Sequence, residues 1–398
     1  MTREDIRGSV NAGYEPVREA FERNFTEHGD TGASVAVYVD GEKKVDLWGG
    51  VAVVATGRAW TEDTVALVFS VTKGATAVLC AMLADRGELD LDAPVSQYWP
   101  EFAAGGKETI TTRQILSHVA GLPVIDGDLT TAEVIEGSKV VEALARQVPI
   151  WKPGAKHGYH GLTLGWLIGE IVVRATGRSV GDLFATEVAK PLGLDFAIGL
   201  PAEAEARVAP LVEAPPPDPA ELDSIADPAL KQFIQRTIAA MSDATSLMFR
   251  MGTSNGVLPT PSAEHWNRRD VHAVEQPAAN GITNARSLAR LYASCVAPVE
   301  GTRLLSEKAL RAATRVLASG VDEVIGHRNR FASGFTLSSE SLPLVSESSF
   351  GHLGAGGSLG FGDPVRGVGF GYVTNQIGGL TDMRAMSLVG ALRQSLHG

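Results

Sequence analysis

The chain has 398 residues, of which 44% are hydrophobic and 20% are charged, as is usual for a folded globular protein. Its formal net charge of −11 disfavours a nucleic-acid partner or an anionic membrane surface, because either would require a basic face. No run of about eighteen apolar residues occurs, so no membrane span is expected. The first residues lack the apolar core of a signal peptide, and Cys80 and Cys295 both stand in apolar helical patterns. These features favour a cytoplasmic location, where cysteines stay reduced.

The first part of the chain predicts a helix, several strands and then a second, apolar helix. Residues 14–28 have helical spacing, and Gly41-Glu42 is a turn between two patterns of β type. Gly87 is expected to stop the apolar helix. The predicted elements are the strands Ala33–Asp40, Lys44–Trp48 and Val65–Phe69 and the helix Ser70–Arg86.

The middle of the chain is mostly helical by its hydrophobic spacing. Residues 213–219 form a proline-rich connector, and residues 245–262 are expected to be a loop. The predicted helices are Thr112–His118, Thr131–Gln147, Leu162–Thr176, Val180–Ala189 and Pro219–Ala240.

The last part returns to β structure rich in glycine and closes with a helix over Leu380–Leu396. The predicted strands are Gly334–Leu337, Phe350–Leu353, Ser358–Gly362 and Gly367–Thr374. Strands at both ends with helices between them predict an α+β fold, in which both termini build one antiparallel sheet flanked by helices. We expect residues 1–84 and 285–398 to form this α/β domain, and residues 85–284 to form a mostly helical domain with active-site loops.

Ser70 and Lys73 form a Ser-x-x-Lys motif where a predicted strand gives way to a helix. A serine hydroxyl needs a base to act as a nucleophile, and a spacing of three residues puts both side chains on one helix face. Lysine serves as that base only if burial or neighbouring cations lower its pKa. A capping serine beside a solvated lysine is the alternative. We interpret Ser70 as the nucleophile of a hydrolase.

Two further segments carry residues suited to this chemistry. Tyr159, in KHGYHGLTLGWL, could relay a proton between nucleophile, base and leaving group, or could be a core tyrosine at a helix entry. His352-Leu353-Gly354 lies in a predicted strand before a glycine-rich run. There the backbone can approach a substrate closely, and an N–H group can bind an oxyanion. His352 could equally be a strand histidine whose hydrogen bonds are satisfied.

Two other patterns are interpreted as structural. Gly356-Gly357-Ser358-Leu359-Gly360 matches the nucleophile-elbow pattern, but the residues after it predict β structure rather than the helix that an elbow requires. Only His397 could then serve as its histidine, so Ser358 is expected to be a turn or strand residue. His157-x-x-His160 has no second pair of ligands at zinc-like spacing, so no metal site is expected.

The three motifs, in this order, resemble those of the penicillin-recognising serine hydrolases, which include D,D-peptidases, class C β-lactamases and family VIII carboxylesterases. The resemblance runs from about Val35 to the C-terminal helix and is weak only over residues 200–280. The similar segments are LVFSVTKGATAVLCAMLADRGELDLDAPVSQYWPEF, ITTRQILSHVAGLP, VPIWKPGAKHGYHGLTLGWLIGEIV and FGHLGAGGSLGFGDPVRGVGFGYVTN.

This resemblance implies the fold of that family, with the active site between the sheet domain and the helical domain. It implies Ser70 as the nucleophile, Lys73 as the base or proton shuttle, and Tyr159 as the tyrosine of the family's Tyr-x-Asn motif. The segment His352-Leu353-Gly354 matches the family's Lys-Thr-Gly strand. The backbone N–H groups of Ser70 and Ala355 would form the oxyanion hole.

Two departures from the family pattern concern substrate binding. Gly161 stands where the family often has asparagine, and His352 stands where β-lactamases have lysine. Both changes resemble the esterase branch, so a cytoplasmic serine carboxylesterase acting on small, short-acyl esters is expected, with His352, Leu353, Gly354 and Gly161 lining the substrate site. No metal or organic cofactor is implied.

Several alternatives stay open at this point. The same mechanism would serve a β-lactamase, a D-amino-acid peptidase or amidase, or an acyltransferase. A non-catalytic binding protein on the same fold is a further alternative, which the intact Ser70, Lys73 and Tyr159 disfavour. The sequence leaves the oligomeric state open, a homodimer included.

Overall fold

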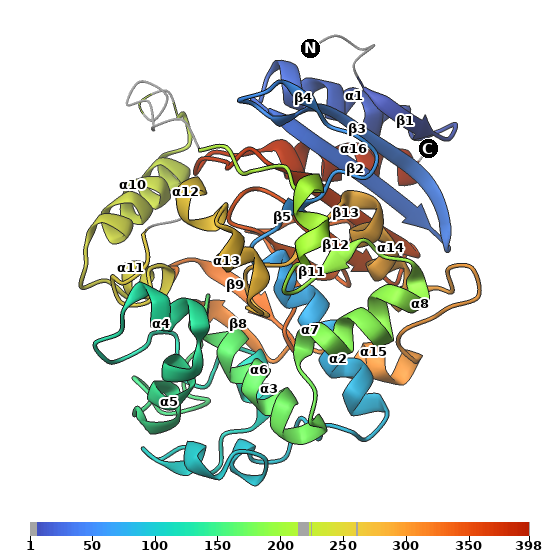
Figure 1. The fold of residues 1–398 in the computed structure, drawn as a ribbon. Helices are drawn as coiled ribbons and strands as arrows, with labels where there is room; N and C mark the ends of the chain where they lie inside the picture. Colours follow the sequence, from blue (N-terminus) through green and yellow to red (C-terminus); the bar gives the residue numbers. More distant parts are fainter. Residues whose placement is uncertain (1–5, 214–222, 224, 260–261, 398) are drawn as a thin grey trace.

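The computed structural model describes residues 6–213, 223, 225–259 and 262–397. Its centre is a ten-stranded antiparallel sheet to which both ends of the chain contribute (Figure 1). The strands lie in the order β1-β3-β2-β13-β12-β11-β10-β9-β8, with β4 paired to β3. Their bounds are Arg7–Val10 (β1), Gly32–Val39 (β2), Glu42–Val53 (β3), Arg58–Ala59 (β4), Ala318–Val321 (β8), Arg328–Phe331 (β9), Thr336–Leu337 (β10), Phe350–Leu353 (β11), Leu359–Asp363 (β12) and Val368–Thr374 (β13). The predicted fold class, α+β with one antiparallel sheet built from both termini, is confirmed.

A second, three-stranded sheet lies beside the start of the apolar helix. It consists of β5 (Ala66–Leu67), β7 (Ile282–Thr283) and β6 (Phe196–Ala197), in that order. The first of these strands leads almost directly into α2 (Val71–Asp85). The backbone before α2 is therefore fixed by pairing with segments that lie far away in the sequence.

Helices cover both faces of the large sheet. On one face pack α1 (Glu15–Thr26) and α16 (Arg384–His397), and on the other pack α14 (Ala285–Val296) and α2. Successive side chains of a strand point to opposite faces, so each strand feeds both cores. In β2, for example, Val35 and Val37 join the core under α1 and α16, whereas Ala36 and Tyr38 join the larger core.

The remaining helices form the helical part of the molecule, most of it below the sheet in Figure 1. None of the helices in the described ranges has the length and the apolar character that crossing a membrane demands. Their bounds are Thr112–Leu116 (α3), Thr131–Glu136 (α4), Ser138–Arg146 (α5), Thr163–Thr176 (α6), Val180–Leu183 (α7), Lys190–Leu192 (α8), Pro228–Ser242 (α10), Leu247–Gly252 (α11), Ala263–Trp266 (α12), Arg269–Ala273 (α13) and Glu307–Thr314 (α15).

Two local predictions are wrong. The helix expected over residues 131–147 is two helices, because Gly137 takes a left-handed conformation with φ +92° that ends α4 and begins α5. The loop expected over residues 245–262 contains α11, whose first turn is capped by the Ser246 hydroxyl. The connector at residues 213–219 lies almost wholly outside the described residues, and the division into two domains stays a prediction.

Glycines in β13 allow α14 to lie directly on the sheet. A Cβ atom added at Gly369 would stand 2.3 Å from the backbone nitrogen of Ala293. A Cβ atom added at Gly371 would stand 2.4 Å from the carbonyl oxygen of Ala285. Both distances are shorter than van der Waals contact, so the glycine-rich sequence of this strand follows from the helix that covers it.

We therefore expect Gly369→Ala to lower the free energy of unfolding by about 1–3 kcal/mol, because the added methyl group forces α14 away from the sheet. Gly390→Ala is the matched control, since Gly390 lies inside α16 and a Cβ there meets nothing within 4 Å. That change should leave stability unchanged or raise it by up to about 1 kcal/mol. Urea unfolding of the two variants measures both effects, and equal midpoints would contradict the packing argument.

Candidate active site

Ser70 stands at the N-terminal end of α2, directly after a strained residue. Phe69 has φ +45°, a left-handed value that is rare for a residue other than glycine. The Thr72 hydroxyl holds this turn, because it donates to the Phe69 carbonyl at 2.6 Å and accepts from the Gly281 N–H at 2.8 Å. The side chain of Ser70 does not cap the helix, so its hydroxyl is left for other partners.

The amine of Lys73 is held by three oxygens from three separate segments. Its Nζ lies 3.0 Å from Ser70 Oγ, 2.6 Å from the carbonyl oxygen of Gly161 and 2.8 Å from that of Ala278. Lys73 is 1% exposed, and this burial holds the pKa of its amine well below the usual value. A neutral amine has two N–H groups, which can donate to the two carbonyls and so direct the lone pair at Ser70 Oγ.

Tyr159 completes the set of groups around the serine hydroxyl. Its phenol donates to Ser70 Oγ at 2.8 Å, and Lys73 Nζ lies 4.9 Å from the centre of its ring. Burial raises the pKa of Tyr159, so the phenol keeps its proton near neutral pH. The arrangement can therefore pass a proton between Lys73, Ser70 and an attached leaving group.

Residues on both sides of Tyr159 fix its position. Its backbone N–H donates to Asp322 Oδ1 at 3.1 Å, and the same oxygen accepts from the Val324 N–H at 2.8 Å. The His118 ring lies 5.0 Å from the Tyr159 ring, and His118 Nδ1 accepts from the His160 N–H at 3.0 Å. These bonds anchor the tyrosine segment to the turn between β8 and β9 and to the chain after α3.

The end of β11 lies against the turn that carries the nucleophile. A Cβ atom added at Gly354 would stand 2.4 Å from the carbonyl oxygen of Val68, so this close approach requires glycine. Leu353 and Ala355, on either side of Gly354, are exposed. The segment expected to bind substrate therefore borders the serine turn and faces outward.

His352, the preceding residue of β11, is buried and neutral. Its Nδ1 lies 2.8 Å from the Leu353 carbonyl oxygen, which can only accept, so Nδ1 carries the ring proton. Burial lowers the pKa of His352 to about 3. Its Nε2 is buried with no hydrogen-bond partner among the described residues, so it presents a lone pair rather than a cation.

Gly161 leaves no free space where a side chain would stand. A Cβ atom added there would lie 2.0 Å from Met251 Sδ, and Met251 comes from α11. A thioether from another part of the chain thus occupies the position that a side chain at residue 161 would need. The polar amide expected from the family pattern is replaced by an apolar wall.

Ser358 is not placed on a nucleophile elbow. It precedes a strand, β12, instead of a helix, and its side chain is buried. Its Oγ accepts from the Thr374 N–H at 3.3 Å, and its carbonyl accepts from the Gly354 N–H at 2.7 Å. Ser358 is thus the turn or strand residue that the sequence predicted.

The histidine pair also has structural partners. His160 Nε2 accepts from the Leu122 N–H at 2.9 Å, and its Nδ1 lies 2.7 Å from the Gly158 carbonyl oxygen. His157 Nε2 pairs with Asn329 Oδ1 at 2.9 Å. Across the described ranges, no group of three or more histidine, cysteine or acidic residues is arranged to hold a metal ion.

Three residues at this site were missed by sequence analysis: Ala278, Met251 and Asp322. Ala278 acts through its backbone carbonyl, so its side chain gives no signal. Met251 lies in the part of the chain where the family resemblance is weak. Asp322 accepts hydrogen bonds from a following turn, a pattern that many structural aspartates share.

Comparisons with known proteins agree with this geometry. The family model described as Beta-lactamase matches residues 18–394. The esterase/beta-lactamase LipL of Mycobacterium tuberculosis is 34% identical over 94% of this chain and 83% of its own length. The crystal structure of a family VIII carboxylesterase superimposes with a TM-score of 0.85, at 35% identity over 98% of this chain and 99% of that one. EstA from Arthrobacter nitroguajacolicus Rue61a superimposes with a TM-score of 0.83, at 34% identity over 98% of each chain.

These matches span the whole site, from the serine at the start of α2 to the strand that borders it. A family model covering nearly the full chain and a relative above 30% identity over most of both lengths lead to one conclusion. The chain belongs to the beta-lactamase family of serine hydrolases.

Proposed function

We propose that this protein is a serine carboxylesterase that hydrolyses small, short-acyl esters through a covalent acyl-enzyme on Ser70. The observation that carries the proposal is the pair of contacts on Ser70 Oγ, from Lys73 Nζ at 3.0 Å and from the Tyr159 hydroxyl at 2.8 Å. A hydroxyl that is hydrogen-bonded to a buried amine and to a phenol has both a base and a proton donor within reach.

Acylation would begin when neutral Lys73 takes the Ser70 proton while Oγ attacks the ester carbonyl carbon. The carbonyl oxygen becomes an oxyanion, which the backbone N–H groups of Ser70 and Ala355 would bind. When the intermediate collapses, the bond from carbon to the alcohol oxygen breaks. Tyr159 gives its proton to the departing alkoxide and regains one from Lys73.

Deacylation would follow the reverse path with water as the nucleophile. Neutral Lys73 takes a proton from water, with the Tyr159 hydroxyl as a relay, as the water attacks the acyl carbon. Lys73 then returns that proton to the departing Ser70 Oγ. Because the pKa of Lys73 is lowered, the amine is available as a base well below the pH at which an exposed lysine loses its proton.

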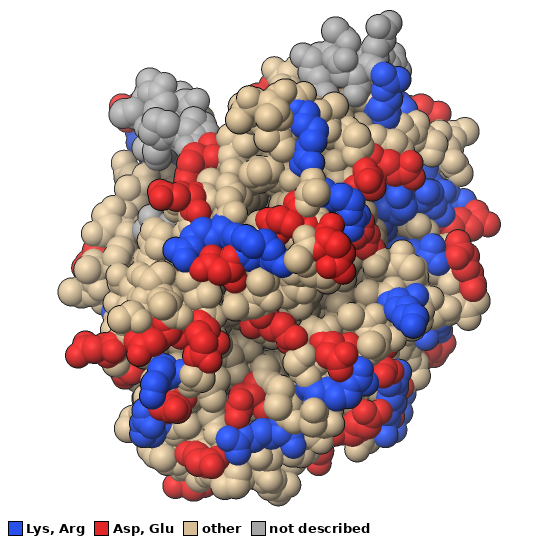
Figure 2. Space-filling model, in the orientation of Figure 1, with Lys and Arg blue, Asp and Glu red and all other residues tan. Residues whose placement is uncertain are grey.

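The surroundings of the serine favour an uncharged substrate. His352 is buried and neutral, so it offers no cation to pair with a substrate carboxylate. Met251 fills the space beside Gly161, so no side-chain amide is available there for a peptide or lactam carbonyl. Acidic and basic side chains are interspersed over the face drawn in Figure 2, without a field of one sign.

A second candidate function is β-lactam hydrolysis. The observation that favours it is the similarity along most of this chain to LipL, which is named as both an esterase and a beta-lactamase. The same acyl-enzyme chemistry would open a lactam ring. The two candidates differ in whether the site accepts a carboxylate next to the scissile carbonyl.

The assignment of the nucleophile is tested by covalent labelling. A fluorophosphonate should label the peptide that contains Ser70, and Ser70→Ala should lose label and about a thousandfold in kcat for a nitrophenyl ester. Ser358→Ala is the control and should keep label and most activity, since that side chain is buried in the sheet. Label found on the peptide of Ser358 would overturn the proposed mechanism.

The substrate class is tested by comparing kcat/KM on one preparation for nitrophenyl butyrate, nitrocefin and a penicillin. We expect the ester to exceed both lactams by at least about thirtyfold, because two lost polar contacts cost about 1–3 kcal/mol each. Similar values for lactams and ester would favour the second candidate function.

The role of the apolar wall is tested by a double-mutant cycle at Gly161 and Met251. Gly161→Asn should lower the free energy of unfolding by less than about 1 kcal/mol, because the Met251 thioether that its Cβ meets is the end of a flexible side chain and can shift. Met251→Ala in the same chain should recover that loss, so the two changes should be non-additive. The double variant should also hydrolyse nitrocefin faster than the parent. Additive stabilities would show that Met251 does not occupy this position in solution.

A further inference from the structure

A tight hairpin turn over residues 354–357 joins β11 to β12 and carries Ala355. The Gly354 N–H donates to the Ser358 carbonyl at 2.7 Å, and the Gly357 N–H donates to the Gly354 carbonyl at 2.9 Å. Gly357 has φ +100°, the positive value that closes a hairpin turn of this length. Ala355 is exposed at the tip of the turn.

Two backbone donors near the nucleophile are free. The N–H groups of Ala355 and Ser70 make no hydrogen bond to any of the described residues. They are therefore available for the oxyanion of the proposed mechanism. Donors of this kind are effective only when they are held at the place where the charge develops, so whatever fixes the 354–357 turn also affects catalysis.

One side of the 354–357 turn packs on the residues that precede the nucleophile. As described above, Gly354 lies against the Val68 carbonyl. A Cβ atom added at Gly356 would stand 3.0 Å from the ring of Phe69. The backbone on either side of Ala355 is thus in close contact with the turn that carries Ser70.

The other side of the 354–357 turn packs on two charged side chains at the start of α16. A Cβ atom added at Gly357 would stand 2.5 Å from Asp382 Oδ2 and 2.9 Å from Arg384 Nη2. These two atoms form an ion pair at 2.6 Å. Arg384 Nη2 also donates to the Gly356 carbonyl at 3.4 Å, and the Gly378 N–H donates to the same oxygen at 3.2 Å.

Arg384 is itself fixed to the large sheet. It is 1% exposed, and its Nη1 donates to Asp30 Oδ1 at 2.7 Å. The Asp30 carboxylate also accepts from the hydroxyls of Tyr372, at 2.6 Å, and Thr374, at 2.8 Å, both of which belong to β13. A planar guanidinium with five donors can hold all these partners at once, so Arg384 connects the 354–357 turn rigidly to the sheet.

We infer that Arg384 and Asp382 are positioning residues for the oxyanion hole, because they hold the 354–357 turn from behind and so direct the Ala355 N–H at the carbonyl oxygen bound at Ser70. The inference rests on the proposed esterase function and adds two residues to its machinery. Both act through the backbone of Gly356 and Gly357, and neither needs to touch the substrate.

The test compares nitrophenyl butyrate with its thiono analogue, in which sulfur replaces the carbonyl oxygen. Sulfur accepts hydrogen bonds weakly, so the ratio of the two kcat/KM values, each divided by the rate with hydroxide, measures the contribution of the oxyanion N–H groups. Asp382→Asn removes the charge beside Gly357 but keeps an oxygen for the Arg384 N–H, which Asp382 Oδ1 accepts at 3.0 Å. We expect this change to lower kcat for the ester about ten- to hundredfold, to alter KM less than about threefold, and to lower the ester-to-thiono ratio about tenfold.

A second variant and a control separate positioning from stability. Arg384→Lys keeps a cation for Asp30 but cannot donate in several directions from a planar group, so it should lower the ester-to-thiono ratio as well. Asp363→Asn is the matched control. Asp363 lies at the other end of β12, where its carboxylate accepts from the hydroxyls of Ser346 and Ser349 at 2.5 Å. This change should lower the urea midpoint and leave the ratio as in the parent protein.

The outcomes that contradict the inference are specific. If Asp382→Asn slows the ester and the thiono ester equally, lowers only the urea midpoint, or changes neither rate, the pair is purely structural and the inference is wrong. An equal fall of the ratio in Asp363→Asn overturns it too. A parent protein that hydrolyses no nitrophenyl ester contradicts the proposed function itself, and the inference falls with it.

Discussion

Of the three hydrogen bonds on the Lys73 amine, two join α2 to the loop before α6 and to the loop before β7, and the third reaches Ser70 at the start of α2. Burying a charged lysine without a carboxylate is costly. The protein surrounds the Lys73 amine with carbonyl oxygens instead of an anion, so the neutral form of the amine is favoured and the pKa of Lys73 falls. A carboxylate in contact would have raised that pKa and removed the base. The desolvation that opposes folding at this residue is therefore also what makes the amine useful for proton transfer.

Close backbone contacts around this amine depend on residues without side chains. Gly354 allows the end of β11 to touch the Val68 carbonyl. Gly281, directly before β7, comes close enough to donate its N–H to the Thr72 hydroxyl. Any Cβ at these positions would lie closer than 3 Å to its neighbour. The strained φ of Phe69 lies between the two contacts, so pairing on both sides holds a conformation that the local sequence would not choose.

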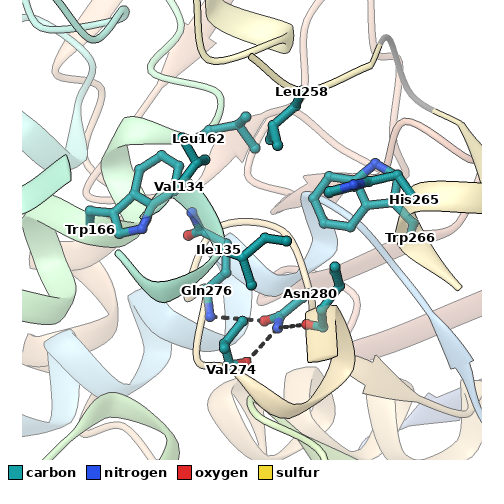
Figure 3. A pocket seen from close by; sticks show the side chains of 11 residues that line it. Val134, Ile135, Leu162, Trp166, Leu258, His265, Trp266, Val274, Gln276 and Asn280 are labelled. Atoms are coloured by element: carbon teal, nitrogen blue, oxygen red, sulfur yellow. Dashed lines mark hydrogen bonds between the residues drawn. The ribbon is translucent and has the colours of Figure 1, made fainter. Parts of the chain in front are cut away.

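The chemistry of the site is set as much by missing charges as by the groups present. His352 is neutral with a bare Nε2, and Met251 turns the side of Gly161 into an apolar surface. A small cavity bounded by Trp166 and Trp266, with Gln276 among its lining residues, is also largely apolar (Figure 3). A substrate without a carboxylate loses nothing on entering such surroundings, whereas an anion would give up its hydration without a partner.

The sequence alone determined the fold class, most long elements and the group Ser70, Lys73 and Tyr159, because these follow from hydrophobic periodicity and from motifs in which residue type carries the chemistry. It did not predict the short strands β1, β8 and β9, whose pairing depends on neighbours distant in the chain. Nor did it divide the helix expected over residues 131–147 into Thr131–Glu136 and Ser138–Arg146, because that break depends on the single residue Gly137. Only tertiary structure brought Ala278 and Met251 to the site. Ala278 acts through a backbone carbonyl, and Met251 acts through its place in space, which no local pattern encodes.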